Sequence, residues 1–363
     1  MQTIFDVTMF GAIGDGSTDD TAALQAAFDA AAEVHGCVTV PPGIYRCGKL
    51  HLGAGVSLRG EAAWQYGTAG ASVFSLCDAG ADCLLDISYA YGCEIRGMCF
   101  EGNMLGNGIH GIKLQYDEYN GGRREDTFTV DDCRAAHFSG DGLHINHGWC
   151  FSVRHSHFAF CRGAGIYLDG WDGFILDNWM SGNCSAGFLG GPVASSLTIT
   201  GNRVEWNREA GFKIRNGDSI NITGNFFDRS YGPALALGSG ETNDLFGRTN
   251  YPDLVSDVTV TGNVFRRSGK PRELPFDDVF DSSHIRLTHC ENCVVVGNTF
   301  KYGRDDGGGG IDSPEYSVVL RDNLACIVRD NVMEKGSMKK NIIDLGDNRE
   351  VICEGNVGDP VDR

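Results

Sequence analysis

The stretch from Leu143 to Leu235 decides the fold, because it repeats one pattern four times. A short apolar run starts each repeat, and successive runs begin 23, 22 and 24 residues apart. These runs are Leu143-His144-Ile145, Ile166-Tyr167-Leu168, Phe188-Leu189-Gly190 and Phe212-Lys213-Ile214. A second extended run follows each one, over 151–158, 174–180, 197–204 and 220–227. One such turn has too few apolar residues to bury a face alone, so the period predicts an all-β solenoid, a parallel β-helix.

Asparagine recurs at or near the end of the second runs. An amide at a recurrent bend can satisfy the turn backbone and bond to the amide one coil away. The general frequency of asparagine in turns explains each residue singly but not their common register. The positions are Asn103, Asn202, Asn225, Asn263, Asn298, Asn331 and Asn356.

The period runs almost to the end of the 363 residues, which predicts a single domain over 1–363. Fifty-one glycines and nine prolines suit many tight corners between short strands. We expect an N-terminal cap over 1–36 and coils of about 22–24 residues over 37–358. Loop insertions are expected at 116–126, 239–256, 268–283 and 303–317, where they would wall a binding cleft.

Charge and cysteine content bear on partners and compartment. The formal net charge of −18 argues against nucleic acid and membrane as partners, and a polyanionic substrate would need a local basic groove. The first residues lack the pattern of a signal peptide, so fourteen cysteines predict reduced thiols in a cytoplasmic protein. Cys290-x-x-Cys293 has no second pair at zinc spacing, so we expect no metal and no cofactor. The flat sides of a solenoid would permit a homo-oligomer.

A helix is predicted over residues 22–32, where apolar residues follow helical spacing. Its buried face should consist of Leu24, Ala27, Phe28 and Ala31. Ser17, Thr18, Asp19 or Asp20 would cap it, and the helix would close the open end of the solenoid. Asp15, Asp19 and Asp20 also resemble a calcium loop, but capping and turn roles are favoured.

The first sixty or so residues resemble the start of the pectate-lyase-type β-helix proteins. The resemblance rests on Phe10-Gly11-Ala12-Ile13-Gly14-Asp15-Gly16 with Asp19-Asp20-Thr21, and on Val40-Pro41-Pro42-Gly43-Ile44-Tyr45 after the helix. That group includes polygalacturonases, other glycosidases, polysaccharide lyases and phage tailspikes. The resemblance implies a single-stranded right-handed parallel β-helix and says little about the reaction.

Ser139-Gly140-Asp141-Gly142-Leu143 is similar to the polygalacturonase Asn-Thr-Asp-Gly-Ile segment, which implies a catalytic acid at Asp141. That family has an aspartate pair one coil later. Here the equivalent segment is Arg162-Gly163-Ala164-Gly165-Ile166, which contains no carboxylate. The departure argues against an ordinary polygalacturonase.

Aligning the second runs on their asparagines places Glu205, Asp228 and Arg266 in one column. Adjacent coils lie about 4.7–4.9 Å apart, so Glu205 and Asp228 should be neighbours. Two close carboxylates raise one pKa, while an arginine keeps the other group ionised. We therefore predict that Glu205 and Asp228 are the catalytic acid and base or nucleophile, at a separation that favours retention. The alternative is a solvated charge ladder capped by Arg266.

Aromatic and charged residues near this column are predicted to bind the sugar. They are Asp169, Trp171, Asp172, Trp206, Lys213, Arg215 and Arg266. Second-rank candidates are Asp141, His144, Asp305 and Asp306. The sequence thus predicts a glycoside hydrolase or transglycosylase acting on an oligosaccharide or polysaccharide. A polysaccharide lyase on a uronate and a non-catalytic, tailspike-like binding protein are the alternatives.

Overall fold

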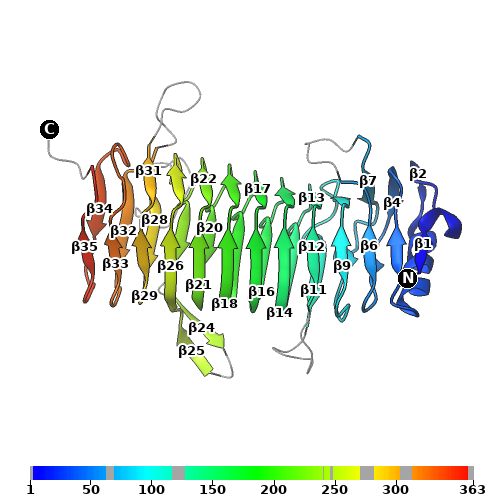
Figure 1. The fold of residues 1–363 in the computed structure, drawn as a ribbon, viewed down its shortest axis with the longest axis horizontal. Coiled ribbons are helices and arrows are strands. Elements are labelled where there is room, and N and C mark those ends of the chain that lie inside the picture. Colours follow the sequence, from blue (N-terminus) through cyan, green and yellow to red (C-terminus); the bar gives the residue numbers. More distant parts are fainter. Residues whose placement is uncertain are drawn as a thin grey trace. The chain divides into compact units, whose positions relative to one another are not determined.

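The computed structural model describes residues 3–62, 69–116, 127–239, 241–245, 248–269, 282–302 and 313–358. Their contacts divide into two units, Met1–Trp179 and Met180–Arg363, which we call unit one and unit two and describe separately. In each, the chain passes repeatedly through three strand faces, and consecutive passes pair in parallel (Figure 1). Both units are therefore stretches of parallel β-helix, as predicted. The single domain expected over 1–363 stays a prediction.

Unit one has three strand faces. The first face contains β5 (Leu50–His51), β8 (Cys83–Asp86), β11 (His110–Gln115) and the starts of β14 (Leu143–Arg154) and β16 (Ile166–Leu176). The second contains β1 (Ile4–Asp6), β3 (Cys37–Thr39), β6 (Ser57–Arg59), β9 (Glu94–Arg96), β12 (Thr129–Asp131) and the ends of β14 and β16. The third contains β2 (Asp15–Asp19), β4 (Gly43–Cys47), β7 (Ser72–Leu76), β10 (Cys99–Glu101), β13 (Arg134–Ala136) and β15 (His157–Ala159). β17 (Trp179–Ser181) spans the boundary between the units in sequence.

Unit two repeats the arrangement. Its first face contains the start of β18 (Phe188–Thr200), β20 (Phe212–Ile214), β23 (Leu235–Leu237), β28 (Ser283–Thr288), β32 (Tyr316–Arg321) and β34 (Lys340–Asp344). The second contains the end of β18, β21 (Gly217–Thr223), β26 (Val255–Thr261), β29 (Cys290–Glu291), β30 (Val294–Val296), β33 (Ile327–Arg329) and β35 (Ile352–Glu354). The third contains β19 (Arg203–Glu205), β22 (Phe226–Asp228), β27 (Val264–Arg266) and β31 (Thr299–Lys301). The antiparallel hairpin of β24 (Thr242–Leu245) and β25 (Arg248–Pro252) projects from this stack (Figure 1).

The structure corrects the predicted two runs per coil. Each predicted second run bends and contributes strands to two faces, as in 220–227, which contains the end of β21, a bend just before Asn225 and most of β22. Three predicted insertions also end earlier, because β26, β28 and β32 begin at Val255, Ser283 and Tyr316. Residues 117–126, 240, 246–247, 270–281 and 303–312 of these insertions lie outside the described residues.

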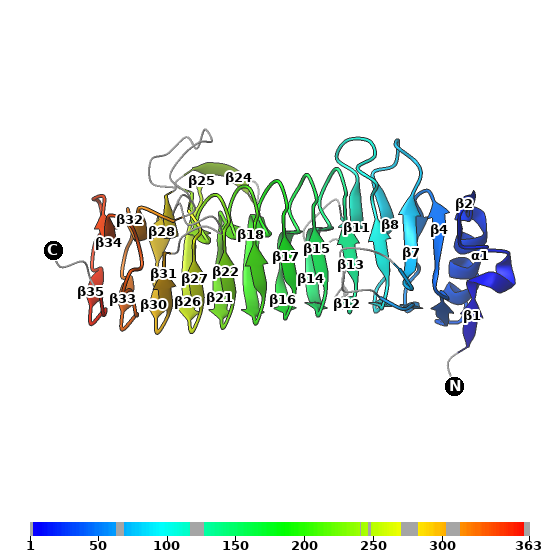
Figure 2. The same ribbon diagram turned by 90° about the horizontal axis from the view of Figure 1, so that it is seen from above.

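The N-terminal cap contains η1 (Val7–Phe10) and α1 (Thr21–Ala32), and α1 packs against β1, β3 and β5 (Figure 2). Leu24, Ala27, Phe28 and Ala31 form its buried face, as predicted. Asp20 is the N-cap residue of α1, but its side chain makes no hydrogen bond to the first turn. Asp19 accepts the Thr21 N–H, whereas the Asp20 carboxylate accepts the N–H groups of Ile13 and Gly14 at 2.7 and 3.1 Å. No α-helix among the described residues is long and apolar enough to cross a membrane.

The asparagine column is a continuous hydrogen-bonded ladder in unit two. The Asn263 Oδ1 atom accepts the backbone N–H of Asn225 at 2.9 Å and its side-chain amide at 3.0 Å. The Asn263 Nδ2 atom donates to the carbonyls of Ile222 and Thr261 and to the Asn298 amide oxygen. The same contacts join Asn202 to Asn225, Asn298 to Asn331 and Asn331 to Asn356. Asn103 does not join it, because its amide donates to Ser75 and Leu76.

We predict that Asn263→Ala lowers the free energy of unfolding by about 3 kcal/mol, because it strips partners from buried backbone groups on two coils. Asn221→Ala, at an exposed position of β21, should change it by less than about 0.5 kcal/mol. Urea unfolding followed by circular dichroism measures both values. Equal losses in the two variants would mean that the ladder contributes no more than any surface amide.

Candidate functional site

Polar side chains form a row on the outside of the first face of unit one. Inward residues of β11, β14 and β16 are buried apolar residues, and the residues between them point outward. Lys113 pairs in register with Asp86 on one side and His144 on the other, and His144 pairs with Tyr167. Paired residues on adjacent parallel strands lie about 4.8 Å apart, so residues from four coils meet in one row.

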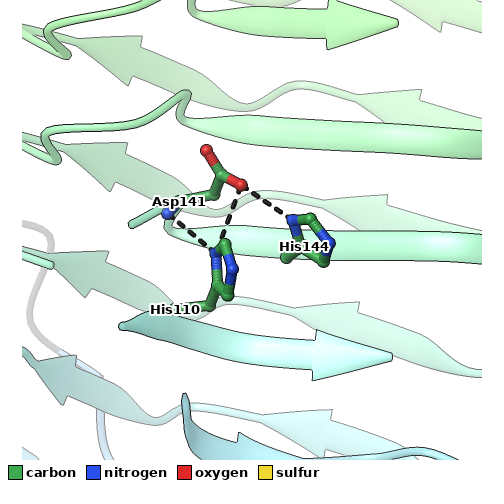
Figure 3. Close-up of side chains that lie close together, drawn as sticks. All are labelled: His110, Asp141 and His144. Atoms are coloured by element: carbon green, nitrogen blue, oxygen red, sulfur yellow. Dashed lines mark hydrogen bonds and ion pairs between the residues drawn. The ribbon is translucent and has the colours of Figure 1, made fainter. Parts of the chain in front are cut away.

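His144 belongs to a tight cluster with Asp141 and His110 (Figure 3). Its Nδ1 atom lies 2.8 Å from the Asp141 Oδ2 atom, and the His110 Nδ1 atom lies 3.2 Å from the same oxygen. The Asp141 backbone N–H also donates to His110 Nδ1 at 3.0 Å. The turn into β14 supplies Asp141, β14 itself supplies His144, and the first residue of β11 is His110.

The next coil fixes the position of the Asp141 carboxylate. The backbone N–H of Ala164 donates to Asp141 Oδ1 at 2.7 Å. Gly163 leaves room for that oxygen, because a Cβ atom at Gly163 would lie 2.2 Å from Oδ1 and 2.7 Å from the Gly140 carbonyl carbon. The segment 162–166, which lacks a second carboxylate, therefore holds the Asp141 carboxylate in place.

Electrostatics give this cluster one anion and one neutral base. Although burial opposes ionisation, the neighbouring imidazoles of His110 and His144 lower the pKa of Asp141 to about 2. Burial lowers the pKa of His144 below its ordinary value of 6.5, and this outweighs the opposite effect of Asp141. An ionised carboxylate can only accept, so the His144 proton is on Nδ1 and the lone pair is on Nε2.

Two lysines bring positive charge to the row. Lys113 binds Asp82 at 3.1 Å, and Lys49 binds both Asp82 and Asp86 at 2.9 Å. Burial raises the pKa of Asp82, but the hydrogen bonds from both lysines outweigh it and keep that carboxyl ionised. Lys113 thereby forms an ion pair on the strand next to His144.

Aromatic rings flank the cluster. The Tyr167 ring stacks on the His144 ring with centroids 4.6 Å apart and planes 8° apart. Further along β14 and β16, Trp149 pairs in register with Trp171 and donates to Asp172 at 2.6 Å. Flat rings of this kind can stack on sugar rings.

Three of the predicted sugar-binding residues, Asp169, Trp171 and Asp172, lie on the same strand as Tyr167. The structure therefore groups them with Asp141 and His144 in unit one. The Asp169 carboxylate is buried and faces the His147 Nε2 atom at 3.6 Å.

The predicted catalytic pair lies in unit two, where Glu205 and Asp228 are register partners on β19 and β22. They are 5% and 2% exposed. Arg203 binds Glu205 at 3.1 Å. Arg267 and Arg229 bind Asp228 at 2.8 and 3.0 Å.

The predicted partner of Asp228 was therefore wrong: Arg266 is its register neighbour, but Arg267 forms the ion pair. The Arg229 guanidinium also covers Trp206, 4.6 Å from the ring centroid. These contacts form a charge cluster around two buried carboxylates, and the catalytic role of Glu205 and Asp228 stays a prediction.

The remaining predicted residues have other contacts. Lys213 binds Glu209, and Arg215 binds Glu241 and Asp253. Asp305 and Asp306 lie outside the described residues. No disulfide joins cysteines in the part of the chain that the structure describes, and Cys293 and Cys326 are fully buried.

Sequence reasoning missed His110, Lys113 and Tyr167. The available signal was the outward position of each first run, which His144 and Tyr167 share. His110 and Lys113 lie before the insertion at 116–126, which breaks the period between their coil and that of His144.

Comparisons with known proteins agree on the fold. A family model described as a right handed beta helix region matches residues 85–250. The A-modules of the Azotobacter vinelandii mannuronan C-5 epimerases AlgE4 and AlgE6 superpose with TM-scores of 0.68 and 0.71 at 20% and 19% identity. These matches cover 97% of this chain and 95% and 98% of theirs.

The DFA-IIIase of Arthrobacter chlorophenolicus A6 in complex with GF2 superposes with a TM-score of 0.66 at 15% identity. That match covers 97% of this chain and 94% of the DFA-IIIase. The chain therefore has the right-handed parallel β-helix fold.

Proposed function

We propose that this chain is a carbohydrate-active enzyme that removes the C5 proton of a uronate residue, with His144 as the base. The observation that carries the proposal is the neutral His144, whose Nδ1–H is bound by Asp141, between Lys113 and Tyr167 in one row. The likeness to two proteins named mannuronan C-5 epimerases also supports it.

The chemistry needs a base, a cation and a second proton-carrying group. C5 of a uronate is α to its carboxylate, so the base abstracts this proton and the electron pair moves onto the carboxylate. His144 Nε2 takes the proton, and the Lys113 cation balances the added negative charge. The O4 substituent then leaves with a proton, which is lyase chemistry, or a proton returns to the opposite face, which is epimerisation. The Tyr167 hydroxyl is the second proton-carrying group of the row.

A glycoside hydrolase or transglycosylase is the second candidate, with Glu205 and Asp228 as its carboxylates. Their register pairing favours it, because retaining enzymes hold two carboxyl groups about 5–5.5 Å apart. The likeness to DFA-IIIase also supports it. Two observations argue against this candidate: both carboxyl groups are buried, and each forms an ion pair with arginine.

The reaction class is tested with a panel of uronate polymers and neutral oligosaccharides in D2O. A lyase gives an unsaturated product that absorbs in the near ultraviolet, and an epimerase gives deuterium at C5. His144→Gln should lower kcat by about 10²–10⁴-fold, because the base is lost. His289→Gln is the control, because it removes a half-exposed histidine that directly follows β28. New reducing ends without either product, or full activity in His144→Gln, would contradict the proposal.

The two candidates differ in what Glu205→Gln and Asp228→Asn should do. Under our proposal, Asp228→Asn destabilises the protein by about 3–5 kcal/mol, because it removes the buried anion that two part-buried arginines bind. The fraction that remains folded should keep its turnover per molecule. If both variants fold normally and lose turnover, the hydrolase candidate is favoured instead.

The pH dependence follows from His144, which must be neutral to act. Because its pKa in the folded protein lies below 6.5, the acid limb of kcat/KM should have its midpoint below pH 6.5. Asp141→Asn removes the carboxylate that raises this pKa, so the limb should move to still lower pH while kcat falls. An acid limb above pH 6.5 in the wild-type protein would rule out His144 as the base.

A further inference from the structure

We propose that His110, Asp141 and His144 also form a binding site for one divalent transition-metal ion, with Zn²⁺ as the probe. The metal site stands on its own geometry. Its effect on turnover, which we infer to be inhibition, rests on the proposed function. Nothing else in the described residues brings three such ligand atoms within 4.8 Å of one another.

The spacing of the three ligand atoms fits a metal ion. The two imidazole Nδ1 atoms lie 2.8 and 3.2 Å from the Asp141 Oδ2 atom. Ligands about 2.0–2.1 Å from a zinc ion are roughly 3.0–3.4 Å apart in tetrahedral or octahedral geometry. Both nitrogen–oxygen distances are close to this range, and all three ligand atoms lie within 4.8 Å of one another.

The donor set selects the class of metal. Two imidazoles and one carboxylate suit zinc, cobalt, nickel or iron(II), whereas Ca²⁺ and Mg²⁺ prefer oxygen ligands. The Ala164 N–H holds Asp141 through Oδ1 and leaves Oδ2 for the ion. Three protein ligands leave a coordination position for water. The three side chains are 12–18% exposed, so the ion can reach them from the outer face.

Two contacts oppose binding. The ion would replace the hydrogen bond from the Asp141 backbone N–H to His110 Nδ1. It would also lie near the Lys113 cation, whose charge Asp82 balances at 3.1 Å. These contacts predict moderate affinity.

Metal binding changes which nitrogen of His144 has the lone pair. Without metal, Nδ1 has the proton and Nε2 has the lone pair. A metal on Nδ1 needs that lone pair, so the ring proton moves to Nε2 and the ring stays neutral. Nε2 can then no longer accept the substrate proton, and the bound ion blocks the base.

The site is tested by Co²⁺ titration of the whole protein, with the visible absorption of the bound ion as the readout. We expect one Co²⁺ per chain, displaced by Zn²⁺, and at least a tenfold weaker Kd in His110→Ala and in Asp141→Asn. His289→Ala is the matched control, because His289 and Asp322 also have a 2.8 Å Nδ1–Oδ2 contact but no third donor within the described residues. Circular dichroism checks that each variant is folded. No binding by the wild-type protein, or equal binding by all variants, would overturn the site.

The effect on turnover is measured separately. Zn²⁺ should reduce turnover in proportion to Co²⁺-calibrated occupancy, and a chelator should restore it. Unchanged turnover at full occupancy, or a chelated enzyme that needs Zn²⁺ to act, would overturn the inhibition. If no uronate is processed at all, the proposed function fails, and the Co²⁺ titration still decides the metal site.

Discussion

The register between successive coils is the constraint on which the rest of the structure depends. Parallel pairing places each residue beside its equivalent one coil away, so every inward or outward position becomes a column. Identical side chains then satisfy one another: Asn263 bonds to Asn225 and Asn298, and Phe265 stacks on Phe227 and Phe300 at 5.0 and 4.9 Å. A shift by one residue would turn each of these columns to the wrong side, so the buried amides fix the register of the polar columns outside.

The candidate site uses this constraint to assemble chemistry from separate coils. His144 receives its anion from the turn before its own strand, its aromatic neighbour Tyr167 from the next coil and its cation Lys113 from the previous one. No single segment contains this combination. The close approach of Gly163 and Ala164 to Asp141 then holds the carboxylate in place, and burial keeps His144 neutral although its hydrogen bond to Asp141 acts in the opposite direction.

The sequence predicts features that depend on period alone. The repeat predicts the coils, the asparagine column and the pairing of Glu205 with Asp228, because each needs only a constant step along the chain. The repeat does not predict contacts that are made by residues in the turns between strands. Arg229 and Arg267 both have positive φ, at 55° and 44°, in the turns after their strands, and there their side chains bind Asp228. An alignment of columns assigns that contact to Arg266. Insertions hide other contacts, as for His110.

The two carboxylate clusters differ in whether a proton can move. Asp228 faces guanidinium groups, which do not deprotonate in proteins, so its contacts are static ion pairs. Asp141 faces imidazoles, whose proton can occupy either ring nitrogen. Burial of the first cluster therefore stabilises one arrangement of charge. Burial of the Asp141 cluster leaves His144 as a neutral base. Whether its lone pair lies on Nε2 or on Nδ1 depends on whether Nδ1 has a proton or a metal ion. A substrate proton and a metal ion make opposite demands on that ring, because one needs the lone pair on Nε2 and the other needs it on Nδ1. If His144 is to accept a substrate proton, the cluster must therefore be free of metal during turnover.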